Sequence, residues 1–444
     1  MDLAPKNGAN IFFKNEEDKK ELLQWIYMFK KECNLSIHNV YLDNFSDVVD
    51  IAIQDGKILE IGPNLNYQAD NKFDGMGCLV TTPFIDPHTH LDKAFIQPSI
   101  NQSGTLEEAI KIMQGCNKNI IGEKFDERVD KAISWALKHG TLFIRTHIDV
   151  DNVNGTSSIE MMRKVKERWS GIVDIQIVAF PQYGLMKYPE IREFIRHAVE
   201  IGADLVGGIP ALEDTPASAR EHINYIFKIA EEFNIDVDMH IDETDDPNSR
   251  TLEMLADVTI NAGWEGRVTA THCCALAAYH DDYARKVIDK VAKANISIIT
   301  NPMVNLVMQG RNDPQPVRRG ITRVKELISA GVNVSCGNDN LRDVFFPFGK
   351  FDMLEVAYIT SLTSHMTGSD EINYVLNMPR NNAARILGLT SYGLHKGCAA
   401  DMVLIPAKSP EDLLGSKPPR KAVIRKGKII CESEEIVRMV PLFG

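Results

Sequence analysis

The stretch Asp236-Val237-Asp238-Met239-His240-Ile241-Asp242-Glu243 shows in eight residues how this chain is built. A short apolar run, typical of a buried strand, ends in a histidine and two carboxylates. Pro247-Asn248-Ser249 follows and marks the start of a helix. The stretch therefore predicts one strand-then-helix unit with polar side chains where the strand ends.

Runs of the same kind recur along the chain. Eight of them begin near Leu79, Thr141, Asp174, Asp204, Asp236, Arg267, Ile296 and Asn333. Helix-like segments lie between them, and several stop before a glycine, the residue favoured just beyond a helix end: Phe125 to His139, Pro189 to Ile201 and Thr322 to Ala330. Eight such units predict an α/β protein with a (β/α)₈ TIM barrel, because a doubly wound sheet usually has about five to seven strands.

Strand patterns of another kind lie on both sides of these units. Residues 47–58 contain two strand-like runs joined by an Asp-Gly turn, and residues 400–405 and 421–430 look like further strands. Neither flank alone has enough strands to bury a core. We therefore predict a small β-sandwich domain formed by residues 35–78 plus 395–444, around a barrel formed by residues 79–394.

The first 34 residues form a separate extension. Asn15 is placed to cap a helix whose Leu22, Leu23, Ile26 and Phe29 form an apolar face. We expect this helix to pack on the barrel or on another subunit, rather than to have a regulatory or membrane role. It also offers a surface for association, and we expect a homo-oligomer.

Composition narrows the class of partner. With 444 residues and a net charge of −12, the chain lacks the concentrated positive face that binding of nucleic acid requires. No window has the eighteen or so apolar residues of a membrane span, and the first residues lack the apolar core of a signal peptide. We expect a cytoplasmic enzyme with a small-molecule substrate, whose eight scattered cysteines are reduced structural thiols.

Four side chains at the ends of the predicted strands suit a metal ion. His88 and His90 follow the first run and stand on the same side of it, His240 ends the fifth run, and Asp339 ends the eighth. All four then project from the barrel face where active sites lie. Imidazole and carboxylate ligands fit one divalent ion, zinc or iron(II), and leave room for a water that the ion can ionise near neutral pH. For Asp339, a structural role in capping its loop is the alternative; as a ligand it can also accept a proton from the attacking water.

Glu243 is the candidate for moving protons. It follows His240 by three residues, so its carboxylate can overhang the same water. Asp242 and Asp245 compete for this role, but we expect them to point away or to cap the following helix. His147 ends the second run and lies near the pocket rim, where we expect it to support a ligand or to anchor a loop.

Several stretches resemble the cytosine deaminase branch of the amidohydrolase superfamily, over residues 40 to 430. The resemblance is carried by Phe180-Pro181-Gln182, His240-Ile241-Asp242-Glu243, Thr269-Ala270-Thr271-His272, Asn301-Pro302-Met303-Val304-Asn305, Gln309-Gly310-Arg311 and Arg319-Gly320-Ile321-Thr322-Arg323. It implies a mononuclear site made of His88, His90, His240 and Asp339. It also implies that Glu243 is the proton shuttle, that His272 holds the attacking water and that Gln182 reads the edge of a pyrimidine.

The chain departs from that branch beside the substrate. Cytosine deaminases have an Asp-Asp pair where this chain has Asp339-Asn340, and the aromatic position that follows is Phe345. Residues 88–93 and 339–343 look closer to the N-isopropylammelide amidohydrolases, which remove amines from s-triazines. Because an amide both donates and accepts hydrogen bonds, Asn340 can favour a ring other than cytosine.

We predict from these motifs a metal-dependent hydrolytic deaminase of a small cyclic amidine, with cytosine as the first candidate. Creatinine and an N-alkylated s-triazine are the alternatives within the enzymes. A non-catalytic scaffold on the same fold is the alternative of a different class, and the complete set of ligand positions argues against it.

Overall fold

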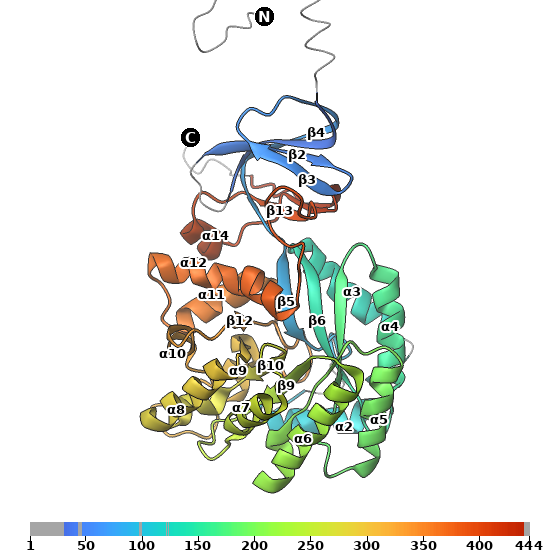
Figure 1. The fold of residues 1–444 in the computed structure, drawn as a ribbon, viewed down its shortest axis with the longest axis vertical. Helices are drawn as coiled ribbons and strands as arrows, with labels where there is room; N and C mark the ends of the chain where they lie inside the picture. Colours follow the sequence, from blue (N-terminus) through green and yellow to red (C-terminus); the bar gives the residue numbers. More distant parts are fainter. Residues whose placement is uncertain (1–30, 43–46, 97–99, 121, 123, 439–444) are drawn as a thin grey trace, which may run out of the picture.

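Eight parallel strands form the central sheet, in the spatial order β12-β11-β10-β9-β8-β7-β6-β5 (Figure 1). They are β5 (Phe84–Thr89), β6 (Thr141–Asp149), β7 (Asp174–Phe180), β8 (Leu205–Val206), β9 (Val237–Ile241), β10 (Val268–His272), β11 (Ser297–Thr300) and β12 (Val334–Cys336). The computed structural model describes residues 31–42, 47–96, 100–120, 122 and 124–438. A parallel bridge between Thr89 and Asp339 joins the first and last strands, so the sheet closes into the predicted barrel.

Helices follow the strands around the outside of the barrel. The principal ones are α2 (Leu106–Ile120), α3 (Phe125–Lys138), α4 (Ser157–Trp169), α5 (Pro189–Glu200), α6 (Pro216–Phe233), α7 (Thr251–Ala262), α8 (Asp281–Lys293), α9 (Pro302–Met308), α10 (Val324–Ser329), α11 (Met353–Thr363), α12 (Ser369–Asn377), α13 (Ala383–Ile386) and α14 (Pro410–Ser416). The 3-10 helices η1 (Pro210–Leu212) and η2 (Cys274–Ala278) and the π-helical segment η3 (Met378–Asn382) connect some of them. Among the described helices, none is both long and apolar enough to cross a membrane.

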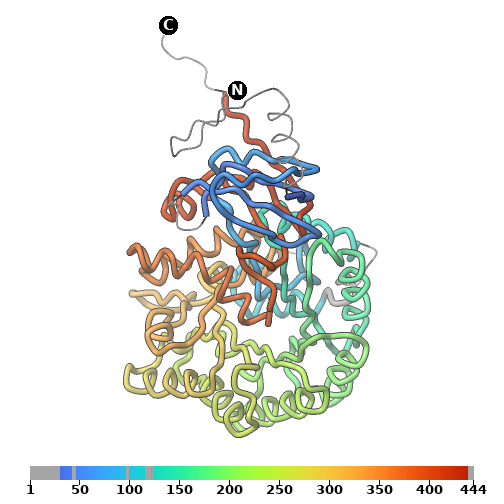
Figure 2. The backbone as a smooth tube through the Cα atoms, turned by 45° about the horizontal axis from the view of Figure 1, so that its top comes forward, coloured from blue at the N-terminus to red at the C-terminus, as the bar shows by residue number. Residues whose placement is uncertain are grey.

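The main core lies between the barrel strands and this helical layer. Every residue of β6 and β9 is buried, which is the pattern of a parallel strand covered on both faces. The helices contribute one apolar stripe each; in α8 it consists of Ala284, Val287, Ile288 and Val291. Figure 2 shows the helices surrounding the barrel, with both flanks of the chain together at one end.

The two flanks build a second, seven-stranded sheet in the order β15-β14-β13-β4-β1-β2-β3. Its strands are β1 (Lys31–Tyr41), β2 (Val48–Gln54), β3 (Lys57–Gly62), β4 (Tyr67–Thr81), β13 (Met402–Ile405), β14 (Ala422–Arg425) and β15 (Lys428–Glu432). The β2–β3 turn has positive φ at both Asp55 and Gly56, as the Asp-Gly pair predicts. The sheet curls around its own core, because the Ala400 N–H donates to the Gly56 carbonyl and Ile53 lies close to Gly427. This confirms a small domain made from both ends of the chain.

Seven of the eight predicted barrel strands begin within one residue of the expected position, and the first begins later. Leu79 to Thr81 pair with β13 and belong to the end of β4, so the first barrel strand starts at Phe84 instead of near Leu79. Residues 31–34, assigned above to the extension, are the first residues of β1. The predicted helix at residues 15–29 lies outside the described residues. The domain boundaries at residues 78 and 395 stay a prediction.

Candidate metal centre and active site

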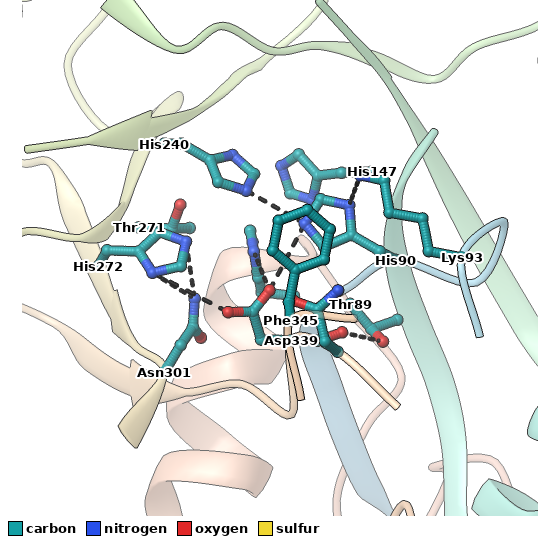
Figure 3. A network of polar contacts seen from close by, with 12 residues as sticks. Thr89, His90, Lys93, His147, His240, Thr271, His272, Asn301, Asp339 and Phe345 are labelled. Atoms are coloured by element: carbon teal, nitrogen blue, oxygen red, sulfur yellow. Dashed lines mark hydrogen bonds and ion pairs between the residues drawn. The ribbon is translucent and has the colours of Figure 1, made fainter. Parts of the chain in front are cut away.

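The four predicted ligands meet at one end of the barrel. The ligand atoms of His88, His90, His240 and Asp339 all lie within 4.8 Å of one another, and all four side chains are buried. His90 Nε2 is 3.2 Å from His240 Nε2, and His88 Nε2 is 3.4 Å from Asp339 Oδ1. In Figure 3 the side chains of His90, His240 and Asp339 converge from different strands on a common centre. The structure therefore brings together all four residues that the sequence proposed.

Closure of the barrel sets the positions of three of these ligands. The Asp339 N–H donates to the His88 carbonyl at 2.8 Å, and the His90 N–H donates to the Asp339 carbonyl at 3.0 Å. The Thr89 hydroxyl donates to the same carbonyl at 2.7 Å. Below them, Asp86 Oδ1 accepts the N–H groups of both His88 and Asn338. The first and last strands are thus joined by main-chain bonds at the residues that carry the ligands.

The chemistry of the cluster fits a divalent cation. Burial lowers the pKa of His88, His90 and His240 well below the usual histidine value, so their rings are neutral and keep a lone pair. Within the described residues, both ring nitrogens of His88 and the Oδ2 of Asp339 are buried without a hydrogen-bond partner. Unpaired buried polar atoms are costly. A metal ion in their midst would take up one nitrogen of His88 and the Asp339 oxygen, so the residues present fit the predicted cofactor.

Glu243 and His272 stand beside the ligands. His272 Nδ1 is 3.6 Å from Glu243 Oε1 and 4.0 Å from Asp339 Oδ2. Burial lowers the pKa of His272 to about 3, which makes its ring neutral, and Asn305 Nδ2 lies 3.1 Å from its Nδ1. Burial and the Asp339 charge raise the pKa of Glu243 well above that of an ordinary glutamate. A carboxyl that holds a proton readily is therefore placed next to the ligands.

The competing carboxylates have structural partners, as predicted. Asp242 accepts hydrogen bonds from the Ser249 hydroxyl at 2.6 Å and from the N–H groups of Thr251 and Leu252, and so caps α7. Asp245 accepts the Gly310 N–H from a neighbouring loop. Their carboxylates are occupied, and Glu243 is left as the carboxyl that faces the ligands.

A buried lysine joins the predicted substrate residues. Lys93 is 1% exposed, its Nζ donates to Gln182 Oε1 at 2.6 Å, and it lies 2.8 Å from Asp149 Oδ1. The same Nζ is 5.9 Å from the centre of the Phe345 ring. Sequence reasoning gave Lys93 no role, although it stands in the same segment as two ligands. A lysine three residues after His90 was the available signal.

Asn340 is fixed by a carboxylate on its own loop. Its Nδ2 donates to Asp343 Oδ2 at 2.6 Å, and Asp343 Oδ1 accepts the N–H groups of Phe345 and Phe346. Gln182, Asn340 and Phe345 are all buried beside the site, between 4% and 6% exposed. The three residues proposed for the substrate are therefore close to the ligands, and Asp343 is a further residue that the sequence did not reveal.

His147 lies against the ligand His88, and the expected role in supporting a ligand stays a prediction. Its ring centre is 4.3 Å from that of His88, and its Nε2 is 3.3 Å from Asp238 Oδ1. Asp238 is in turn paired with the buried guanidinium of Arg145 at 2.8 Å. A buried row of charged and polar side chains thus extends from His88 down the inside of the barrel.

A large cavity leads to the site. It measures about 810 Å³ and is lined by the loops that follow β8, β9 and β11, together with the start of α2. Glu243 and Gln309 lie in its wall. The cavity therefore reaches the site at Glu243.

Comparison with known proteins agrees with this site. The model of the family described as "Amidohydrolase family" matches residues 126–431. The chain is 34% identical to 5-methylcytosine deaminase from Klebsiella pneumoniae, solved with 5-fluorocytosine, with a TM-score of 0.87 and coverage of 91% of this chain and 99% of that one. It is 30% identical over 419 residues to N-isopropylammelide isopropyl amidohydrolase from Pseudomonas sp. (strain ADP), covering 92% of this chain and 99% of the relative.

A third relative is named for a different substrate, a pterin. The chain is 32% identical over 390 residues to pterin deaminase from Rhizobium rhizogenes (strain K84 / ATCC BAA-868), covering 86% of this chain and 88% of the relative. The family model and the relatives indicate a hydrolase of C–N bonds, and the barrel and the ligand cluster agree with this chemistry. The chain therefore belongs to the amidohydrolase family, in its cytosine deaminase-like branch, and is a hydrolytic deaminase.

Proposed function

We propose that this enzyme hydrolyses the exocyclic C–N bond of cytosine or a closely related aminopyrimidine and releases ammonia. The observation that carries the proposal is the placement of Glu243 and His272 against a complete set of four metal ligands. The likeness to an enzyme solved with 5-fluorocytosine supports a pyrimidine as the ring.

One divalent ion, zinc or iron(II), is the cofactor in this proposal. His88, His90, His240 and Asp339 would hold it, since their neutral imidazoles and carboxylate are the donors that both metals accept. When bound, such an ion polarises a carbonyl-like carbon and supplies a water whose pKa lies near neutral.

The protein groups around the ligands handle the protons. Glu243 takes the first proton that the attacking water gives up and passes it to the ring nitrogen beside the reacting carbon. It then moves the second proton of that water from the new hydroxyl to the amine nitrogen, so the C–N bond breaks, ammonia leaves and the ring keeps a carbonyl oxygen. The raised pKa of Glu243 helps it to hold that proton between the two steps. His272 is neutral, so one ring nitrogen carries a proton that it can donate to the oxygen added to the ring.

The substrate residues surround the ring. Gln182 and Asn340 offer amides to its polar edge, and Phe345 contributes an apolar face. Lys93 is a positive charge behind Gln182. Burial alone would lower its pKa, but the neighbouring Asp149 and Asp92 carboxyls outweigh burial and raise the pKa.

A pterin is the second candidate substrate. The cavity of about 810 Å³ is far larger than one pyrimidine needs, and a relative 32% identical is named as a pterin deaminase. N-isopropylammelide, named in a relative 30% identical, is the third. Creatinine, a cytoplasmic location and a homo-oligomeric assembly stay predictions.

An ammonia-release panel tests this ranking. The zinc- or iron-loaded enzyme is supplied with cytosine, 5-methylcytosine, pterin, creatinine and N-isopropylammelide, and ammonia and isopropylamine are measured separately. We expect a cytosine to have the highest kcat/KM. Isopropylamine from the triazine without ammonia from either cytosine would refute the proposal.

Glu243→Gln tests the proton path. The variant keeps a side chain of the same shape, so fold and metal content should be unchanged, while kcat falls by about two to four orders of magnitude. Glu265→Gln, an exposed carboxyl before β10, is the matched control and should keep the activity of the parent enzyme. Full activity of Glu243→Gln would remove the role assigned to Glu243.

A further inference from the structure

Two buried carboxamides lie beside the ligand cluster, and their neighbours differ in chemical character. Gln182 lies against Lys93, a cation, whereas Asn340 lies against Asp343, a carboxylic acid. A carboxamide has one end that donates and one that accepts hydrogen bonds. The sign of the neighbouring charge therefore decides which end is left for a substrate.

Lys93 fixes the orientation of Gln182. An ammonium group donates hydrogen bonds and cannot accept them, so the oxygen of Gln182 must face it, as the 2.6 Å contact shows. Lys93 is itself held by Asp149 at 2.8 Å and is 1% exposed, so its charge is not shared with solvent. The Nε2 of Gln182 makes no hydrogen bond within the described part of the chain. It is left as a donor toward the pocket.

Asp343 fixes Asn340 in the opposite sense. Two main-chain N–H groups, those of Phe345 and Phe346, each donate to Asp343 Oδ1 at 2.9 Å and so orient the carboxyl. Its Oδ2 accepts from Asn340 Nδ2 at 2.6 Å. The Oδ1 of Asn340 makes no hydrogen bond to any described residue and is left as an acceptor.

We propose that Lys93 and Asp343 are positioning residues that set the two amides in opposite senses, so that the pocket offers a donor from Gln182 and an acceptor from Asn340. This inference rests on the proposed function. It defines the ring that fits as one with a hydrogen-bond acceptor toward Gln182 and a donor toward Asn340. Asn340 directly follows the ligand Asp339, so the donor lies near the reacting carbon, where the exocyclic amine is attached. The acceptor is then a carbonyl oxygen or an unprotonated nitrogen farther along the ring.

This chain has Asn340 where cytosine deaminases have an aspartate. We infer that this difference changes the hydrogen-bonding character of the pocket less than the sequence suggests. The donor end of the new amide is used inside the loop, on Asp343, and the end that remains has the acceptor character of a carboxylate without its charge. We expect the pocket to favour neutral amidines over protonated ones.

A reciprocal exchange tests the Asn340–Asp343 pair. N340D places two carboxyls at 2.6 Å, and D343N removes the charge that selects one amide orientation, so each should lower kcat/KM by about 10- to 100-fold. In N340D/D343N the amide at position 343 can donate to the carboxylate at position 340 and still accept the two main-chain N–H groups. We expect the double variant to recover to within about 5-fold of the parent enzyme. Losses that multiply instead of cancelling would overturn the pairing.

Two substitutions of Gln182 test its orientation. Q182E keeps an oxygen toward Lys93 and loses the donor, whereas Q182M loses both ends of the amide. If the donor faces the substrate, the two variants should raise KM for cytosine by about the same factor. Near-parental KM in Q182E with a large increase in Q182M would mean that the oxygen faces the substrate, against the proposal.

Neutron diffraction of the deuterium-exchanged, zinc-loaded enzyme separates this inference from the function on which it rests. Deuterium marks the nitrogen of each carboxamide whether or not a substrate is known. Nitrogen of Gln182 toward the pocket and nitrogen of Asn340 toward Asp343 would support the inference even if no aminopyrimidine were turned over. The reverse orientation of either amide would overturn it even if cytosine proved to be the substrate.

Discussion

Gly337→Ala tests whether barrel closure sets the metal site. Gly337 lies between β12 and the ligand Asp339, and its Cα faces the first barrel strand. A Cβ at this position would lie 2.6 Å from Asn301 Oδ1, 2.8 Å from the Cβ of His88 and 3.0 Å from the His88 carbonyl oxygen. Two of these three atoms belong to a residue proposed to hold the metal.

The expected effect follows from those distances. Carbon atoms in contact normally lie about 3.5–4.0 Å apart, so β5 and β12 must separate by about 0.7 Å or more to accept the methyl group. Overpacking of this kind costs about 1–3 kcal/mol of folding stability. Metal–ligand distances are set to within about 0.2 Å, so a shift of His88 relative to Asp339 should weaken metal binding by about 10- to 100-fold.

Metal titration monitored by elemental analysis, with thermal unfolding of the metal-free protein, measures both effects. Gly415→Ala in α14 is the matched control, because no atom lies within 4 Å of the methyl group that it adds. Gly337→Ala with parental zinc affinity and parental stability would refute the argument that close contact between the first and last strands places the ligands.

Three further perturbations test other parts of the structure. Arg145→Met leaves the fully buried Asp238 without its cation and should lower the free energy of unfolding by about 3–5 kcal/mol in urea titrations; a loss below 1 kcal/mol would contradict this. Removal of metal by a chelator should lower Tm, and added zinc should restore it in a concentration-dependent way, since the ion binds the folded chain; an unchanged Tm would argue against a bound ion. Burial raises the pKa of Glu253, but hydrogen bonds chiefly from Lys290 and Tyr283 outweigh it and lower the pKa to about 2. This carboxylate therefore stabilises the fold above its unfolded pKa, and the contribution is lost as pH falls through about 2. Glu253→Gln should cost about 1–2 kcal/mol at pH 7 and clearly less at pH 2, where the carboxylate is about half protonated in the folded chain; an equal cost at both pH values would contradict the shift.

The sequence predicted the barrel and the ligands because both depend on local patterns. A strand that ends in His240 is visible within eight residues, and parallel strands in a barrel end at the same face wherever they lie along the chain. The ligands His90 and Asp339 stand about 250 residues apart in the chain, yet they could be assigned to one site without knowledge of any contact. The pattern at the end of each strand was sufficient.

Contacts between side chains could not be predicted in this way. Lys93 and Gln182 are 89 residues apart, and nothing in either segment shows that they touch. The start of the first barrel strand was placed near Leu79 for a related reason. Leu79 and Phe84 stand in one apolar stretch interrupted by a proline, and it is pairing with β13, more than 320 residues later in the chain, that assigns Leu79 to the other sheet.

The metal ligands and the substrate amides are held by different kinds of bond, and this separation bears on specificity. Main-chain hydrogen bonds between the first and last strands place His88, His90 and Asp339. Lys93 also contacts this site, since its Nζ lies 3.2 Å from His90 Nδ1. Gln182 and Asn340 instead depend on the charges of single side chains. Exchanging the charge at Asp343 would invert a donor and an acceptor without removing a contact to a ligand, whereas exchanging Lys93 would also change the surroundings of His90. A family that shares the ligand set can therefore act on different rings, and the positions equivalent to Lys93 and Asp343 are where we expect those differences to be decided.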